Sequence, residues 1–535
     1  MAGQGQLTLE QIQDFKGKYP KQIWYMFLVE MWERFCFYGM RGVLTIFMVD
    51  QVTGGLGLSE RSANLQYGTI QAFVYAFTFV GGLFADKILG FKRSLVFGAL
   101  VMIAGNFIIA VNPHTFFYIG ITFSVIGTGF FKPNITSMVG YLYKDGDHRR
   151  DAGFSLFYSG INLGALLGGA VCVYLGKSPD YGWAYAFIAA GTVMIIGLLT
   201  FLLTKKYIQP IGNKPGEDES LHVVEMDQTQ QIVEADIKPV KQKGWWKEYL
   251  VYLGALASIP LILILIKNEN FTTVFMYSLA AVAVLYFLFE LFRQKEVGAK
   301  SKLIAAFIFI FFYFVFETFF EQAGGSLAIF ADKNLHHTML GFFTIDPNIV
   351  NNSANSFFVC IFGALMGLFW LWLAKRKREP NTINKFGISF LLMALSYYLF
   401  YYLRFTADEQ GLTSLGIFTL AYFVISLSEL CLSPIGMSIV TKLSPKRLQG
   451  VMIGMWFLAS AYGQYGAGLL GASMSAAEPV KPAHMATAGE IIQQNFERLN
   501  SYTEGYKQMA IYCLAAGVIL ILCASFIKKL MRGVR

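Results

Sequence analysis

Ionisable side chains occur inside apolar stretches of this sequence, where a bilayer-spanning helix would normally carry none. The stretch VEMWERFCFYGMRG, residues 29–42, holds four of them between flanks of aliphatic and aromatic residues: Glu30, Glu33, Arg34 and Arg41. Four more lie in later apolar stretches: Lys132, Glu317, Glu321 and Glu429. A charge at the centre of a bilayer costs at least about 2.5–3.5 kcal/mol, so these residues are candidates for handling a substrate, an ion or a proton.

Helical spacing groups the charges of the first stretch. Glu30 and Arg34 are four residues apart and therefore share a helix face, with Glu33 beside them. We expect Glu30 to pair with Arg34, which leaves Glu33 as a second carboxylate. Desolvation and neighbouring charges can move the pKa of such a carboxylate towards physiological pH, so that it binds and releases a proton. The alternative is a structural salt bridge that only fixes this helix.

Lys132 lies in GFFKPNITS, directly before a proline that removes a helical hydrogen bond and is expected to kink the helix. Apolar and small residues separate it from Lys144, so its ammonium group is poorly placed to reach the membrane surface. Snorkelling towards that surface is the alternative. We expect a carboxylate partner inside the protein, with Glu30 and Glu33 as the candidates.

Three further acids lie in the second half of the chain. Glu317 and Glu321 are one helical turn apart in FETFFEQAGGSL, whereas Glu429 stands alone in LSELCLSPIGMS. An isolated acid in an apolar segment predicts an anionic site for a cation, and pairing with a neighbouring helix is the alternative. The charged segments hold corresponding places in the two halves of the chain, as expected for a central cavity between two related bundles.

The composition indicates a polytopic membrane protein. Of the 535 residues 55% are hydrophobic and only 14% are charged, against about 25% charged in soluble domains. The net charge of +9 comes from lysines and arginines in alternate short loops. This pattern places both termini in the cytoplasm and indicates orientation, not a nucleic-acid partner. The six scattered cysteines suggest neither a disulfide framework nor a zinc site, and we expect no cofactor and no metal.

Apolar runs long enough to cross about 30 Å of hydrocarbon divide the chain into six, two and six predicted spans. The expected all-α organisation has a cytoplasmic tail (1–22), an N-terminal six-helix bundle (23–204), a cytoplasmic linker (205–245), two additional helices (246–293) and a C-terminal six-helix bundle (302–531). In the last bundle, one span is expected near 302–331 and another near 506–531, after a polar loop (477–505) whose middle could form a short helix. Fourteen unrelated helices of a channel or a membrane enzyme are the alternative plan.

The stretch GGLFADKILGFKR, residues 81–93, resembles the signature loop of the major facilitator superfamily. Its acid Asp86 could form a charge latch with Lys87, Lys92 and Arg93 between neighbouring helices. The alternative is a basic loop that only sets the topology. Together with the six-two-six pattern, this stretch favours the major facilitator fold, with two extra transmembrane helices between its bundles.

Several motifs resemble the proton-dependent oligopeptide transporter (POT) family, of bacterial type. EMWERF followed by Tyr38-Gly39 is similar to its ExxERFxYYG signature. The resemblance continues, in order, through GFFKPN (129–134), DAGFSLFYSGINLG (151–164), FEQAGGSL (320–327) and SELCLSPIGMSIVTKLSP (428–445). Both predicted bundles are covered, and the first and third motifs are highly specific.

The resemblance implies a secondary active transporter, not an enzyme, that takes up di- and tripeptides with protons by alternating access. It implies a multi-pass protein of the bacterial inner membrane, with no nucleic-acid partner and no obligatory protein partner. The implied proton-coupling residues are Glu30, Glu33, Arg34, Lys132 and Glu321. The implied peptide-binding residues are Arg41 and Lys132 for the carboxylate, Glu429 for the amino group, Asn162 and Asn355 for the backbone, and Tyr38, Tyr75, Glu321, Trp456 and Ser460 around them.

Two departures from the family pattern affect details of selectivity. Phe37 stands where the family usually has tyrosine, which we expect to remove a hydroxyl from the cavity, and Ser356 stands where proline is common, which predicts a straighter helix. A proton-coupled symporter of another small solute or a peptide-like drug is the alternative function. No HExxH motif, nucleotide-binding loop or carbonyl filter supports a membrane enzyme or a channel.

Overall fold

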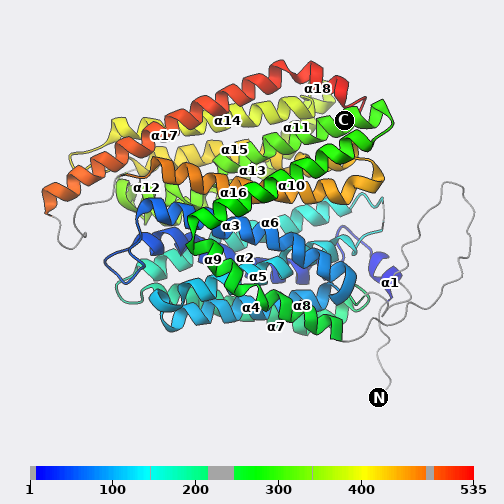
Figure 1. Cartoon of the computed structure of the whole chain (residues 1–535), viewed down its shortest axis with the longest axis horizontal. Helices are drawn as coiled ribbons and strands as arrows, with labels where there is room; N and C mark the ends of the chain where they lie inside the picture. Colours follow the sequence, from blue (N-terminus) through cyan, green and yellow to red (C-terminus); the bar gives the residue numbers. More distant parts are fainter. Residues whose placement is uncertain (1–7, 145, 215–245, 340, 477–486, 535) are drawn as a thin grey trace, which may run out of the picture.

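The computed structural model describes residues 8–144, 146–214, 246–339, 341–476 and 487–534, which are almost wholly helical. The greater part of the predicted linker therefore lies outside the described residues. Figure 1 shows the helices of the first half of the chain and those of the second half as two layers that lie side by side.

The N-terminal layer consists of six long helices. They are α2 (Gln22–Val49), α3 (Glu60–Phe84), α4 (Phe91–Val111), α5 (Pro113–Gly140), α6 (Arg150–Lys177) and α7 (Trp183–Thr204). The short elements α1 (Leu9–Gln13), the π-helix η1 (Ala85–Leu89) and the 3-10 turn η2 (Lys205–Ile208) lie beside them. Side-chain caps fix the starts of two helices, because Ser59 accepts a hydrogen bond from the amide of Ser62 in α3 and Asn112 accepts one from the amide of Thr115 in α5.

The C-terminal layer also consists of six long helices. They are α11 (Val297–Phe320), α13 (Pro347–Lys375), α14 (Thr382–Tyr402), α15 (Leu415–Leu443), α16 (Gln449–Met474) and α17 (Ala488–Leu522). Its short elements are η3 (Glu321–Gly324), α12 (Ser326–Asn334), η4 (Leu403–Thr406), η5 (Lys446–Leu448) and α18 (Ala524–Leu530). An antiparallel pair, β1 (Thr338–Met339) and β2 (Phe343–Thr344), follows α12 with Thr338 opposite Thr344.

Twelve helical segments in the described part of the chain are long and apolar enough to cross a membrane. Two further helices, α2 and α16, are 28 and 26 residues long and carry much of their surface buried against neighbours. The arrangement is consistent with the fourteen predicted spans.

The span predicted near 302–331 is not continuous. Helix α11 ends at Phe320, and η3 and α12 follow it. The break falls at Gly324-Gly325, where a Cβ on Gly324 would lie 1.9 Å from the Tyr67 hydroxyl of α3. Because a side chain at this position would collide with that tyrosine, the two glycines let the C-terminal bundle approach the N-terminal one here.

The polar loop predicted at 477–505 is also different in the structure, because α17 already begins at Ala488 and continues to Leu522. A capping box explains the early start: Thr487 accepts from the amide of Glu490, and the Glu490 side chain accepts from the amide of Thr487. The described part of the predicted loop is thus mostly helix.

The two additional helices form a hairpin that contacts both bundles. Its first arm is broken into α8 (Trp246–Ala257) and α9 (Ile259–Lys267), and its second arm is α10 (Glu269–Arg293). Figure 1 shows α8 and α9 over the N-terminal layer and α10 over the C-terminal layer. Aromatic pairs fix the two arms, with Tyr252 4.6 Å from Phe97 and Phe287 4.5 Å from Phe307 between ring centroids.

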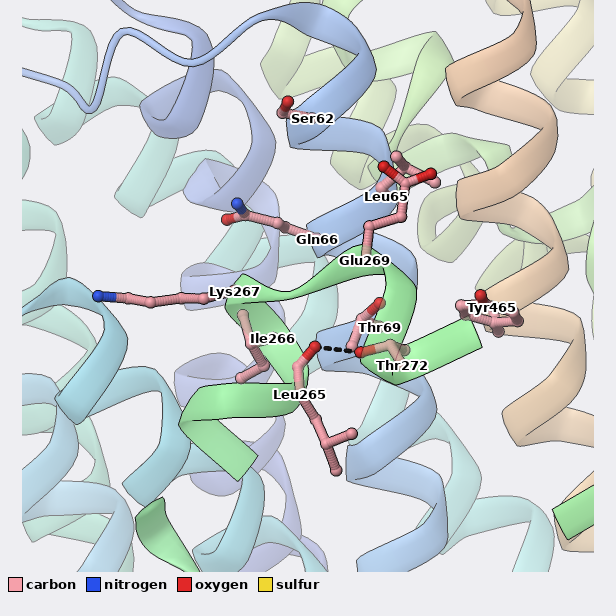
Figure 2. Close-up of a pocket in the computed structure, with 10 residues that line it drawn as sticks. All are labelled: Ser62, Leu65, Gln66, Thr69, Leu265, Ile266, Lys267, Glu269, Thr272 and Tyr465. Carbon is pink, nitrogen blue, oxygen red and sulfur yellow. Dashed lines mark hydrogen bonds between the residues drawn. The ribbon is translucent and has the colours of Figure 1, made fainter. Parts of the chain in front are cut away.

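A small pocket lies where the turn of this hairpin meets both bundles. Figure 2 shows its lining, which comes from α3, from the α9–α10 turn and, through Tyr465, from α16. The Thr272 hydroxyl donates to the carbonyl of Leu265 across the turn, and Glu269 pairs with Arg61 at 3.0 Å. The first contact closes the turn, and the ion pair with Arg61 links the turn to α3.

The charge latch expected at Asp86 is not formed within the described part of the chain, where no ion pair of Asp86 is found. Arg93 instead pairs with Glu248 of α8 at 2.6 Å, and Lys92 donates to the Asn213 side chain at 2.7 Å. The basic residues of this loop therefore hold the hairpin and the segment after α7, because those elements bring oxygen acceptors closer than Asp86 does.

The two ends of the molecule differ in charge. We call the end that carries Arg93, Arg150, Arg376 and Lys529 the basic end, and the end that carries Asp50, Lys177 and Asp346 the opposite end. Because consecutive long helices alternate in direction, the loops predicted to be basic all lie at the same end. Figure 1 shows the C-terminus and α1 at this end.

Candidate transport site

The charged residues of α2 form a buried cluster with more carboxylates than cations. Arg34 Nη2 donates to Glu33 Oε1 at 2.5 Å, and Arg34 Nε lies 3.3 Å from Glu30 Oε1. The predicted pairing of Arg34 with Glu30 is present, but Glu33 is not left over, because Arg34 makes its shorter contacts to Glu33. The other oxygen of Glu30 is buried without a hydrogen-bond partner among the described residues. One guanidinium serves two carboxylates, so the predicted excess of negative charge is present.

The close packing of α6 against α2 explains why this cluster is buried. A Cβ on Gly164 would lie 2.3 Å from the carbonyl oxygen of Met31 and 2.8 Å from Cβ of Arg34. Only a glycine allows α6 to approach α2 this closely, so the α6 motif that ends at Gly164 covers the charged face of α2.

Lys132 does not make the carboxylate pair expected of it. No acid within the described part of the chain lies within ion-pair distance of Lys132, and its ammonium nitrogen lies 4.5 Å from the ring centroid of Tyr75. The ring face provides a cation–π contact, and the lysine is only partly buried, so water can also reach it. The predicted pairing with Glu30 or Glu33 is therefore wrong in this conformation.

A cavity between the two bundles collects the central candidates. It holds about 830 Å³ of atom-free space, and six of the residues expected to bind a peptide line it: Tyr38, Arg41, Asn162, Glu321, Asn355 and Glu429. Helices α2 and α6 of one bundle contribute three of them, and η3, α13 and α15 of the other contribute the rest. Residues of both halves of the chain thus line the cavity.

Arg41 connects the two bundles at one side of this cavity. Its guanidinium forms an ion pair with Glu321 of η3, and its Nε donates to the Tyr67 hydroxyl at 2.8 Å. The guanidinium also lies 5.6 Å from the ring centroid of Tyr38. A cation is therefore held at the cavity wall with a carboxylate from the other bundle as its partner.

Glu429 lies at the other side of the cavity and has polar neutral partners. Asn355 Nδ2 donates to one of its oxygens at 2.9 Å, and the Tyr158 hydroxyl of the other bundle donates to the second at 3.3 Å. Within the described residues no lysine or arginine lies within ion-pair distance of Glu429. The site thus presents a carboxylate that amide and hydroxyl groups orient but that no protein cation neutralises.

Four of the expected residues do not line this cavity. Tyr75 contacts Lys132, as described above. Trp456 stacks on Tyr313 with ring centroids 3.7 Å apart and planes 12° apart, and the Ser460 hydroxyl donates to the Tyr313 hydroxyl at 3.0 Å. The structure therefore places Tyr75, Lys132, Trp456 and Ser460 outside the cavity that contains Arg41 and Glu429.

The bundles meet at the opposite end of the molecule. Lys177 of α6 pairs with Asp332 at 2.8 Å and with Asp346 at 2.7 Å, and Glu60 of α3 pairs with Arg498 of α17. A Cβ on Gly68 of α3 would lie 2.7 Å from Cα of Gly468 of α16. All ion pairs between the two bundles within the described residues lie at this opposite end of the molecule or at the cavity.

The bundles separate towards the basic end. The buried residues of α13 all lie between Pro347 and Val359, although the helix continues to Lys375. A Cβ on Gly367 would meet no atom of the described chain within 4 Å, whereas one on Gly169 would lie 2.9 Å from Asn352. The cavity is therefore closed at the opposite end and opens towards the basic end.

Comparison with known proteins decides the family. A model of the POT family matches residues 92–487. A peptide transporter of Yersinia enterocolitica is 33% identical over 470 residues, which cover 84% of this chain and 87% of the relative. The chain belongs to the POT family.

Other relatives cover nearly the whole chain. A dipeptide and tripeptide permease B of Salmonella typhimurium is 30% identical over 96% of this chain and 96% of its own length. A crystal structure of a peptide transporter of this family with sulfate is 30% identical and superposes with a TM-score of 0.78 over 98% of this chain and 100% of its own. A family member in complex with 5-aminolevulinic acid is 25% identical, with a TM-score of 0.76 over 97% of this chain and 100% of its own.

These findings confirm the predicted fold and class. The POT-family protein described here has the major facilitator fold, with two helical bundles and an additional hairpin, and it is a multi-pass membrane protein. Membership of a transporter family confirms the prediction of a transporter and not an enzyme.

Phe37, the main departure from the family signature, does not face the cavity. Its side chain is buried, and its ring centroid lies 5.0 Å from the Arg34 guanidinium carbon. The expectation that this phenylalanine removes a hydroxyl from the cavity was therefore wrong, because the residue lies under the charged cluster. Ser356 does line the cavity, and α13 is helical through this position.

Three residues of the site were not predicted from the sequence. Tyr158 lies four residues before Asn162 in the α6 motif, so helical spacing could have placed it on the same face. Tyr67, whose hydroxyl accepts a hydrogen bond from Arg41, has no comparable helical spacing to a predicted site residue. Asn351 accepts from the Tyr422 hydroxyl at 2.6 Å and donates to the carbonyl of Ala323 at 2.8 Å, contacts that only the fold reveals. Within the described residues no group of His, Cys, Asp or Glu is arranged to hold a metal ion.

Proposed function

We propose that this protein takes up di- and tripeptides together with protons, by alternating access around the cavity between its bundles. The observation that carries the proposal is a cavity with Arg41 on one bundle and the un-neutralised carboxylate of Glu429 on the other. The relatives named as dipeptide and tripeptide permeases support this substrate class.

A zwitterionic peptide fits this charge arrangement. Its carboxylate would bind Arg41 and its amino group would bind Glu429, since an unpaired charge is costly in a cavity of low dielectric. Asn162 and Asn355 line the cavity and can bond the peptide backbone without reading side chains. Each extended residue adds about 3.3–3.6 Å, so longer peptides would separate the two charged ends beyond the reach of the site.

The remaining expected contacts belong to the peptide-bound state. Tyr38 lies at the cavity wall, whereas Tyr75, Lys132, Trp456 and Ser460 lie outside the cavity here. We propose that these four border it only after the bundles rearrange around a peptide, with Lys132 assisting Arg41 and the other three around the peptide's side chains.

The ion pair between Arg41 and Glu321 gives a route for coupling. A peptide carboxylate must compete with Glu321 for the guanidinium, because both need the same donors. A proton on Glu321 removes its charge and releases Arg41 for the peptide. Proton binding and peptide binding then favour each other, which is the linkage that a symporter requires.

This linkage predicts the behaviour of Glu321→Gln. In the wild-type protein, the affinity for dialanine should rise as the pH falls, because a proton on Glu321 frees Arg41. In the variant, the affinity should stay high at every pH tested, since the competing carboxylate is absent. Calorimetric titration of each purified protein with dialanine at several pH values measures the affinities of the wild-type protein and of the variant.

Glu504→Gln is the matched control, because Glu504 also pairs with an arginine, Arg404, but at an exposed position far from the cavity. It should keep the wild-type pH dependence. An unchanged pH dependence in Glu321→Gln would remove Glu321 from the coupling route.

The buried cluster of α2 provides a second site for a proton. Arg34 can neutralise only one of the carboxylates Glu30 and Glu33, so the pair is expected to hold a proton whenever water is excluded. We propose that this proton is released when the cavity opens, so that Glu30, Glu33 and Arg34 take part in coupling.

We further propose that the basic end faces the cytoplasm, since cytoplasmic loops carry an excess of lysine and arginine. The cavity then opens to the cytoplasm, and the contacts around Lys177 close the outer side. Both ends of the chain would be cytoplasmic in the cell membrane of a bacterium.

Alternating access predicts that Lys177→Gln favours opening at the outer side. This substitution removes two contacts between the bundles, and hydrogen bonds to charged groups contribute roughly 1.5–3 kcal/mol each. The ratio of outward-open to inward-open molecules should therefore rise at least tenfold, or about 1.4 kcal/mol. Spin labels at Val111 and Phe405, exposed positions at this end of the two bundles, report the change as a longer distance by electron resonance.

Lys333→Gln is the control for this experiment. Lys333 also pairs with Asp332, at 2.9 Å, but it belongs to the same helix and does not join the bundles. Its distance distribution should match that of the wild type. If Lys177→Gln also matched it, the contacts around Lys177 would not be the closure of the outer side.

A further inference from the structure

A second, wider cleft lies on the surface of the N-terminal bundle, away from the transport cavity. It holds about 1030 Å³ of atom-free space at the basic end. Its walls come from the start of α4, the end of α7 with η2, the segment Gly212–Lys214 and Tyr252 of α8. No residue of this cleft lines the cavity that contains Arg41 and Glu429.

The cleft has a cationic rim. Four of its lining residues are basic, and none of the described lining residues is acidic: Lys92, Arg93, Lys205 and Lys214. Protein contacts hold three of them in place. Lys92 donates to Asn213 and to the carbonyl of Gln209, Arg93 lies 2.6 Å from Glu248, and Lys214 also pairs with Glu248. Lys205 is exposed, and the positive charges of the rim, of which Glu248 offsets one, attract an anion at the membrane surface.

Below this rim the cleft is apolar. Val96, Phe97 and Leu100 of α4 face Phe201 and Leu202 of α7. Leu100 is 53% exposed, and Leu199 and Leu203 of α7 are exposed as well. Because α4 and α7 are membrane-spanning helices, this wall continues from the interface into the hydrocarbon layer.

We propose that this cleft binds an anionic phospholipid, with its phosphate on the rim of Lys92, Arg93, Lys205 and Lys214 and an acyl chain along α4 and α7. Basic pockets between membrane helices at the interface bind anionic headgroups. A free phosphate would use the rim but not the apolar wall, so the two together select a lipid. The position of Tyr252 and Glu248 means that the bound lipid also contacts α8 of the hairpin.

Photo-crosslinking of the full-length protein in nanodiscs tests the proposal. A benzophenone amino acid is placed at Leu100 in the cleft, or at Leu371, which is 60% exposed near the basic end of α13 beside Lys375 and Arg376. The discs contain phosphatidylglycerol and phosphatidylcholine with equal acyl chains. We expect phosphatidylglycerol to be enriched over phosphatidylcholine in the adduct at Leu100, and clearly less so at Leu371.

Charge variants locate the headgroup. Lys205→Gln, at an exposed position, should reduce the enrichment at Leu100 about fivefold, because each cation near an anionic surface contributes roughly this factor. Arg93→Gln should act in the same direction, whereas Arg376→Gln should leave the adduct at Leu100 unchanged. Glu248→Gln should increase the enrichment, since it removes a carboxylate beside the rim.

Three outcomes would overturn the proposal. Equal labelling by the two lipids at Leu100 would mean that the headgroup is not recognised. Equal enrichment at Leu100 and Leu371 would mean that the basic end attracts anionic lipids in general. Loss of the adduct on addition of soluble glycerol phosphate at millimolar concentration would indicate a site for free phosphate instead of a lipid.

Discussion

Arg41→Ala and Glu429→Gln should each abolish measurable binding of dialanine. Each substitution leaves one charged end of the peptide without its partner inside the cavity between the bundles. Truncating one partner of a buried charge pair costs ~2–5 kcal/mol, which corresponds to a loss of affinity of at least about 30-fold. Titration calorimetry on the purified variants measures this loss, and thermal unfolding confirms that they are folded.

The pair Arg404 and Glu504 is the matched control. These residues form an ion pair in the C-terminal bundle at 3.2 Å, outside the cavity and more exposed. Arg404→Ala and Glu504→Gln should keep the wild-type affinity. Wild-type affinity in Arg41→Ala or in Glu429→Gln would place the substrate elsewhere.

Blocked peptides identify which residue serves which end. N-acetyl-dialanine should bind the wild-type protein much more weakly than dialanine, because it lacks the charge that Glu429 would hold. In Glu429→Gln the two ligands should differ little. An equal affinity of the wild-type protein for both would remove the proposed role of Glu429, whatever Arg41 does.

Glu33→Gln should abolish accumulation of peptide driven by a proton gradient and leave peptide exchange intact. Glu33 accepts two hydrogen bonds from Arg34 in the buried cluster, and glutamine can keep an acceptor there while it loses the titrating group. Glu30 stays as the charged partner of Arg34 at 3.3 Å, so the fold of α2 should survive. Uptake of labelled dialanine into proteoliposomes, with and without a gradient, measures both activities.

Glu10→Gln controls for the loss of a carboxylate, because Glu10 is exposed in α1 and far from the cluster. It should accumulate peptide as the wild type does. Undiminished accumulation in Glu33→Gln would show that this carboxylate does not couple protons, and a loss of exchange as well would indicate a structural role.

The sequence predicted the fold well because the strongest signals in a membrane protein are local. Apolar length marks the spans, and alternating basic loops indicate their orientation. The breaks at Gly324-Gly325 and at Ser258, before α9, were missed, since a helix interruption in an apolar run depends on packing against other helices. The early start of α17 was visible in principle, because Thr487 and Glu490 have capping-box spacing.

The candidate site was predicted less completely. The charged residues could be named, because a charge inside an apolar run is conspicuous. Their partners could not, because pairing depends on which helices meet: Arg41 meets Glu321 across the bundles, and Lys132 meets the ring of Tyr75 and no carboxylate. Uncharged partners such as Tyr67 and Tyr158 look like ordinary aromatic residues of a membrane helix until the fold brings them to Arg41 and Glu429.

Transport by the wild-type protein in proteoliposomes is the direct test of proton-coupled peptide uptake. Labelled dialanine is supplied outside, with and without an inward proton gradient, and its concentration inside is followed over time. We expect accumulation above the outside concentration only with the gradient, and its inhibition by unlabelled di- and tripeptides. Equal internal and external concentrations with the gradient imposed, or no transport of dialanine at all, would contradict it.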